Sequence, residues 1–197
     1  MSLHTHVWLP REGATRTVVA LHGTGGDETD LVPLVRELYP EVNILGLRGN
    51  VNEGGARRFF RRYAEGLFDE ADIRARAADL AAFWPAAMAE YSIDADQATW
   101  LGYSNGANMI GALLLLDDVV REAVLLRAQN LFAEAVDGTA AVKARVTLVS
   151  GEYDPIVPVA EAAKLRDALT ARGHAVQQHM LPTGHQLSRY DLEALGG

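Results

Sequence analysis

Residues 99–116 read TWLGYSNGANMIGALLLL, and this stretch decides the fold. Its first five residues form an apolar run typical of a strand buried on both faces, and residues 105–116 favour a helix that opens directly from it. Between them lies Gly102-Tyr-Ser104-Asn-Gly106, where small residues let strand and helix approach each other. A sharp strand-to-helix turn is the context that a nucleophilic serine requires. The alternative is a glycine-rich turn with an exposed serine.

The rest of the chain alternates short apolar runs with longer amphipathic ones. Further strands are predicted at residues 17–21, 43–47, 123–127 and 146–150, with a more mixed strand at 176–181 and an extra one at 7–9. Further helices are predicted at residues 72–91 and 159–172. Strands separated by helices indicate a mostly parallel sheet with helices on both faces. We therefore expect a single α/β domain over residues 1–197.

Composition and charge exclude several classes of protein. The 197 residues are 49% hydrophobic and 22% charged, which is typical of a soluble globular protein. The formal net charge of −8 repels phosphate backbones and anionic lipids, so we expect no nucleic-acid partner and no membrane partner. The chain has no cysteine, which excludes disulfides and a thiol nucleophile. No secretory signal is visible, so we expect a cytoplasmic protein, and a homodimer stays open.

Asp154 and His185 each follow a predicted strand. Because the carboxyl ends of parallel strands meet at one edge of a sheet, both residues should converge on Ser104. A serine hydroxyl is a poor nucleophile until a base takes its proton, and an acid can orient that base. The three residues therefore predict a Ser-His-Asp catalytic triad. The alternatives are that Asp154 caps the helix near residue 159 and that His185 is an ordinary loop histidine.

A glycine-rich turn, Leu21-His-Gly-Thr24-Gly-Gly26, follows the predicted strand 17–21. A tetrahedral oxyanion needs preorganised donors, usually two backbone N–H groups, and we assign the N–H groups of Thr24 and Asn105. His22 is expected to support this turn. A phosphate site is the alternative, but G-x-G-x-x-G spacing and a P-loop lysine are absent from the turn. The histidines show no metal-ligand spacing, so we expect neither metal nor cofactor.

These motifs together resemble the phospholipase/carboxylesterase branch of the α/β-hydrolases, which includes small bacterial esterases and acyl-protein thioesterases. The matching stretches are LHGTGGDE, GYSNGA, GEYDPIVP and TGHQLS, which begin at Leu21, Gly102, Gly151 and Thr183. Residues 47–72 look especially like bacterial members described as carboxylesterases or hydroquinone-associated hydrolases. The order serine, aspartate, histidine along the chain is also that of this fold.

The resemblance covers nearly the whole chain and implies a hydrolase without a large lid. It implies Ser104 as the nucleophile, His185 as the base and Asp154 as the orienting acid. The expected reaction is hydrolysis of a carboxylic ester or thioester of a small molecule through an acyl-enzyme. An acyltransferase that uses the same triad and a non-catalytic binding protein are the alternatives.

The chain departs from this family at Arg127-Ala-Gln129-Asn130, where a small residue or proline is common. Side-chain amides there suit a polar group on the substrate, and the alternative is that they satisfy local backbone groups. Gln129 is therefore predicted to bind substrate. Phe59 and Phe60 are predicted to form the wall of the substrate pocket.

Four arginines flank Phe59 and Phe60, at Arg57, Arg58, Arg61 and Arg62. We expect them to be solvated and paired with the neighbouring acidic residues Glu53, Glu65, Asp69 and Glu70. The alternative is that one member reaches the cleft and holds an acidic substituent of the substrate, because arginine binds carboxylates bidentately.

Overall fold

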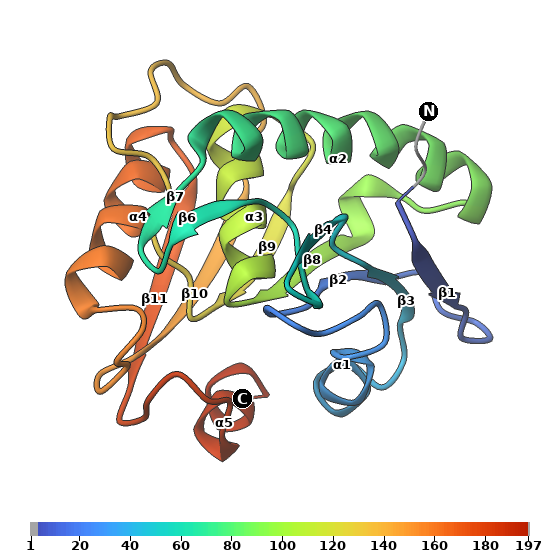
Figure 1. Cartoon of the computed structure of the whole chain (residues 1–197). Helices are drawn as coiled ribbons and strands as arrows, with labels where there is room; N and C mark the ends of the chain where they lie inside the picture. The colour runs from blue at the N-terminus through green and yellow to red at the C-terminus, as the bar shows by residue number, and fades with distance from the viewer. Residues whose placement is uncertain (1–3, 197) are drawn as a thin grey trace.

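The computed structural model describes residues 4–196, and a seven-stranded sheet lies at its centre (Figure 1). The strand order is β1-β3-β2-β8-β9-β10-β11; β1 is antiparallel to β3, and the other neighbours are parallel. The strands are β1 His6–Leu9, β2 Thr17–Leu21, β3 Asn43–Leu47, β8 Ala98–Tyr103, β9 Glu122–Leu126, β10 Arg145–Gly151 and β11 Ala175–Leu181. Residues 1–3 and 197 of the predicted domain lie outside the described residues.

Helices cover both faces of the sheet, so the predicted fold class is confirmed. Three helices pack on one face: α2 Glu70–Tyr91, α3 Asn105–Leu116 and α4 Val159–Ala171. Two short helices pack on the other face: α1 Val32–Leu38 and α5 Arg189–Leu195 (Figure 1). A 3₁₀ turn, Ala95–Gln97, precedes β8. No helix among residues 4–196 is both long and apolar enough to cross a membrane.

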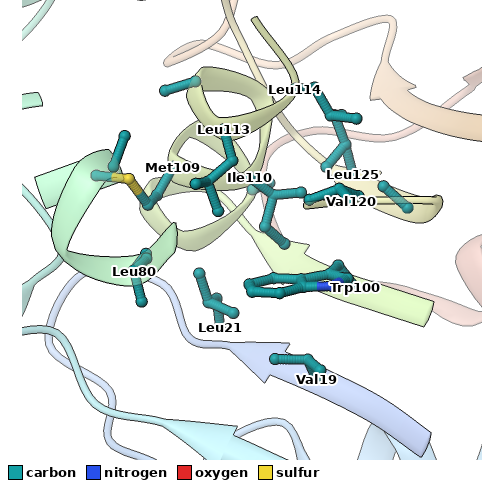
Figure 2. Close-up of a cluster of buried hydrophobic side chains, with 14 of the residues drawn as sticks. Val19, Leu21, Leu80, Trp100, Met109, Ile110, Leu113, Leu114, Val120 and Leu125 are labelled. Carbon is teal, nitrogen blue, oxygen red and sulfur yellow. The ribbon is translucent and has the colours of Figure 1, made fainter. Parts of the chain in front are cut away.

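The two cores follow from the alternation of side chains along buried strands. In β2, Val19 and Leu21 point to the face that α2 and α3 cover, whereas Val18 and Ala20 point to the face of α1. The larger core lies between α3 and the middle strands, around the fully buried Trp100 (Figure 2). Because both faces of the central strands are buried, their sequences are continuous apolar runs.

The predicted elements lie within two residues of the observed ones, but the positions of helices α1 and α5 were not predicted, and neither was the segment between β3 and α2. It forms two small antiparallel hairpins. Their strands are β4 Val51–Glu53, β5 Ala56–Arg58, β6 Arg62–Ala64 and β7 Leu67–Phe68. Strands of two or three residues with charged side chains carry neither an apolar run nor a measurable alternation, so sequence patterns do not reveal them.

Candidate active site

Ser104 occupies a strained turn between the central strand β8 and helix α3. Its backbone angles are φ 51° and ψ −112°, outside the regions that L-residues prefer. The turn is possible because the residues two positions before and after Ser104 are glycines. A Cβ on Gly106 would lie 2.1 Å from the carbonyl oxygen of Leu21, and one on Gly102 would lie 2.6 Å from the amide nitrogen of Ala107. The sequence therefore places Ser104 at the carboxyl edge of the sheet, as predicted.

Ser104, His185 and Asp154 form a continuous hydrogen-bonded chain. His185 Nε2 lies 3.0 Å from Ser104 Oγ, and His185 Nδ1 lies 2.8 Å from Asp154 Oδ2. Because a carboxylate only accepts, Nδ1 carries the proton and Nε2 is left to accept the serine proton. The other carboxylate oxygen, Asp154 Oδ1, accepts from the backbone N–H groups of Ile156 and Val157 at 2.8 and 2.9 Å. Asp154 thus orders its own loop as well as the histidine.

The alternative role for Asp154, as a helix cap, is wrong. Helix α4 starts after Pro158 and has no side-chain cap. His185 is not an ordinary loop histidine either, since only 10% of its side chain is exposed and both ring nitrogens have partners.

Arg127 holds the loop that carries His185, and the sequence did not predict this role. Its side chain is fully buried and donates to the carbonyl oxygens of Gly184 at 2.9 Å and Gln186 at 3.3 Å, on the two sides of His185. It also pairs with both carboxylate oxygens of Asp191, at 2.7 and 2.9 Å. The departure from the family at Arg127 is therefore structural rather than part of the cleft surface.

A signal for the helix that carries Asp191 was present in the sequence. Ser188 and Asp191 have the spacing of a capping box, and the structure shows that box at the start of α5. The box would have located the short helix α5. It would not have revealed Arg127 as the partner of Asp191.

The two predicted oxyanion donors are free. Among residues 4–196, neither the Thr24 N–H nor the Asn105 N–H donates a hydrogen bond. Both residues line the same cavity as Ser104. Asn105 is fixed because its side-chain Oδ1 accepts from the backbone N–H of Phe59 at 2.7 Å.

His22 supports the Thr24 turn in the way the sequence indicated. Its Nε2 accepts from the backbone N–H of Gly49 at 3.0 Å, so the proton is on Nδ1, which donates to the carbonyl oxygen of Gly23 at 2.6 Å. Burial lowers the pKa of His22, because the charged ring would lose its hydration. The neutral ring therefore ties the turn after β2 to the turn after β3.

A cavity of about 440 Å³ opens beside Ser104. It is lined by Tyr103 at the end of β8, Asn108 of α3, and Gln129 and Ile156 of the loops after β9 and β10. The hairpins β4–β5 and β6–β7 complete it with Arg58, Arg62, Glu65 and Phe68. A neighbouring cavity of about 600 Å³ shares several of these residues and extends toward α4.

The predicted substrate-binding residues behave differently from one another. Gln129 lines both cavities, and its side-chain amide makes no hydrogen bond within residues 4–196. Asn130 instead bonds the backbone of Phe132, which is the structural alternative. The prediction for Phe59 and Phe60 needs correction. Their side chains are 2% and 0% exposed in the main core, because they lie between the two hairpins and pack against His22 and Phe68, respectively, and they do not line the cavity.

The arginine cluster is only partly a solvated surface. Arg62 pairs with Glu53 as expected, at 3.0 Å, and Arg61 pairs with Asp72, at 3.2 Å. Arg58 is an exception, since only 4% of its surface is exposed and it lines the cavity beside Ser104. The expectation of a solvated side chain is wrong for Arg58.

Comparisons with known proteins agree on the kind of molecule this chain is similar to. No family model matches it. It is 33% identical over 176 residues to the hydrolase-like protein MhqD of Bacillus subtilis (strain 168), which covers 89% of this chain and 88% of MhqD.

Two solved structures are also similar over most of their length. A Bacillus cereus carboxylesterase superposes with a TM-score of 0.93 at 34% identity, over 99% of this chain and 92% of that one. A Mesorhizobium loti carboxylesterase gives a TM-score of 0.87 at 32% identity, over 93% and 87% of the two chains.

Proposed function

The chain belongs to the phospholipase/carboxylesterase-like α/β-hydrolases, and from this premise we propose that it hydrolyses carboxylic esters with Ser104 as the nucleophile. The observation that carries the proposal is the hydrogen-bonded chain from Ser104 through His185 to Asp154. It supplies a nucleophile, a base within hydrogen-bond reach and a carboxylate that fixes the tautomer of the base.

The reaction proceeds in two matched halves. His185 Nε2 takes the proton of Ser104 Oγ while that oxygen attacks the acyl carbon. The carbonyl double bond becomes a single bond, and the carbonyl oxygen becomes the oxyanion. The imidazolium is stabilised by the carboxylate of Asp154, then gives its proton to the leaving alcohol as the bond to the alcohol oxygen breaks. Water repeats the sequence on the acyl-enzyme and releases the acid. The same steps serve a thioester, with a thiol as the leaving group.

Charge on the tetrahedral intermediate is met by fixed backbone dipoles. The free N–H groups of Thr24 and Asn105 donate to the oxyanion. Ser104 also lies at the N-terminus of α3, where the helix dipole favours negative charge. These backbone N–H groups are already oriented in the folded protein, so no free energy is needed to reorganise them during the reaction.

Labelling with a fluorophosphonate and turnover of 4-nitrophenyl butyrate test the proposal directly. Wild-type protein should be labelled and active. Ser104→Ala should abolish labelling and lower kcat by about four orders of magnitude or more, with an unchanged circular dichroism spectrum. Ser150→Ala is the matched control, because Ser150 lies near the carboxyl end of β10, two strands away from β8, and this variant should keep both properties. Retained labelling or turnover in Ser104→Ala would contradict the assignment.

A further inference from the structure

Arg58 places a buried positive charge in the wall of the cavity beside Ser104. The residue is 4% exposed, although its position in a short surface hairpin would allow a solvated side chain. Its Nη1 donates to Thr24 Oγ1 at 2.7 Å, and its Nε donates to the carbonyl oxygen of Phe60 at 3.3 Å. These contacts fix the guanidinium plane. Within residues 4–196, its Nη2 donates no hydrogen bond.

The charge of Arg58 is only partly compensated. Its acidic neighbour is Glu53, with Oε2 3.2 Å from Nε, and the same carboxylate also pairs with Arg62 at 3.0 Å. One carboxylate therefore faces two guanidinium groups, which leaves one positive charge. Glu65 also lines the cavity, but it is exposed, so water screens its charge. A buried cation without a full partner is unfavourable unless another anion completes the site.

We propose that Arg58 binds a carboxylate of the substrate, so that the preferred substrates are short esters that carry a carboxylate group. This inference rests on the proposed esterase function. A guanidinium fixed by two hydrogen bonds presents its remaining donors in the fork that matches a carboxylate. A single negative charge fits the one uncompensated positive charge. A phosphate dianion would bring a second negative charge for which the cavity wall, within residues 4–196, offers no further buried cation, and the net charge of −8 of the chain disfavours that extra charge.

The position of Arg58 also limits the length of the substrate. Its Nη1 contacts the hydroxyl of Thr24, the residue whose N–H is the proposed oxyanion donor. A carboxylate on Arg58 therefore lies on the same side of the cavity as the ester carbonyl. Monoesters of short dicarboxylic acids and acyl esters of short hydroxy acids carry a carboxylate close to the ester carbonyl, whereas long acyl chains do not.

Two pairs of esters test the inference, and each pair differs by one carboxylate. In the first pair, monoethyl succinate carries the carboxylate on the acyl side, and ethyl butyrate is its neutral counterpart. In the second pair, 3-acetoxybenzoate carries the carboxylate on the alcohol side, and phenyl acetate is its neutral counterpart. Hydrolysis is followed in a pH-stat for wild type, Arg58→Met and Arg58→Lys. Arg61→Met is the matched control, because Arg61 lies in the same segment, its side chain is 63% exposed, and it does not line the cavity.

For at least one pair, Arg58→Met should lower kcat/KM for the charged ester roughly 10- to 100-fold, the range for hydrogen bonds to charged groups. The neutral ester of that pair should change less than about threefold, and Arg58→Lys should lie between wild type and Arg58→Met. Arg61→Met should leave both unchanged. Equal losses on both members of both pairs would overturn the inference while the esterase proposal stands. Absence of turnover of every ester by wild type would defeat the esterase proposal itself.

A binding measurement keeps the test decisive if Arg58→Met does not fold. The Ser104→Ala protein retains Arg58, so calorimetric titration with monoethyl succinate and ethyl butyrate measures binding without turnover. The corresponding comparison uses 3-hydroxybenzoate and phenol for the alcohol side. The carboxylate should tighten binding at least about tenfold in one of the two comparisons. Equal affinities in both comparisons would overturn the inference.

Discussion

Arg127 and Asp191 lie 64 positions apart in the sequence, yet they form a two-pronged ion pair from which solvent is excluded on both sides. The pair joins the turn after β9 to helix α5. Arg127 also binds the backbone on both sides of His185. The position of the proposed base therefore depends on an ion pair that does not touch the substrate.

Removing one partner of this pair should be costly, because the other is left as an uncompensated buried charge. Arg127→Met should lower the free energy of unfolding by about 3–5 kcal/mol, measured by urea denaturation. It should also lower kcat more than it raises KM, since His185 loses its support. The double variant Arg127→Met/Asp191→Leu should regain part of the stability. A double variant that is no more stable than Arg127→Met would show that the charge is not the cause.

Gly106→Ala should destabilise the protein by about 2 kcal/mol or more, because its new Cβ meets backbone atoms that cannot move aside. Gly111→Ala in the same helix is the matched control. Its Cβ would make an ordinary contact with Leu165 at 3.4 Å, and alanine is favoured in a helix interior by about 1 kcal/mol. Thermal unfolding of both variants checks the prediction. A Gly106→Ala protein as stable as Gly111→Ala would contradict it.

The free energy of unfolding should fall as the pH is lowered from about 7 to about 5. His22 and His174 each bridge two backbone groups in the neutral form, and burial lowers the pKa of each below its ordinary value of 6.5. Below that value the unfolded chain binds more protons than the folded one, so acid favours unfolding. Urea titrations at several pH values measure this slope, and His174→Gln should reduce it. A constant free energy over this range would contradict the prediction.

Gln129→Leu should lower kcat/KM about tenfold for an ester that carries a hydrogen-bonding group, and much less for a simple alkyl ester. The reason is that the free amide of Gln129 faces the cavity. Asn130→Leu is the comparison, because its amide is bonded to the backbone of Phe132 and should affect stability instead. Equal effects of Gln129→Leu on both kinds of ester would indicate that the loop has a structural role only.

The sequence predicted the parts of this molecule that depend on local patterns. Buried parallel strands are continuous apolar runs, and each loop that carries Ser104, Asp154 or His185 follows one of them directly. The small residues beside Ser104 likewise have a local cause, the close approach of α3 to β8. For these elements, the alternation of strands and helices along the chain was enough to place three residues at one edge of the sheet.

The remaining parts depend on contacts between distant segments. Phe59, Phe60 and Phe68 are phenylalanines of the same segment. The fold of that segment buries the first two in the core and leaves Phe68 in the cavity wall. Arg58 and Arg61 belong to one charged run, yet only Arg58 is buried. No periodicity separates these cases, because the short strands that decide them have no pattern of their own.

The proposed base and the proposed nucleophile follow strands of the sheet that differ in their support. Ser104 follows β8, which has neighbours on both sides, whereas His185 follows β11, the last strand of the sheet, which pairs only with β10. Edge elements open with lower free energies than central ones. Partial opening of β11 would move His185 away from Ser104 while the turn between β8 and α3 stays intact. Inactivation by heat or urea should therefore precede loss of the circular dichroism signal, and amide hydrogens of β11 should exchange faster than those of β8.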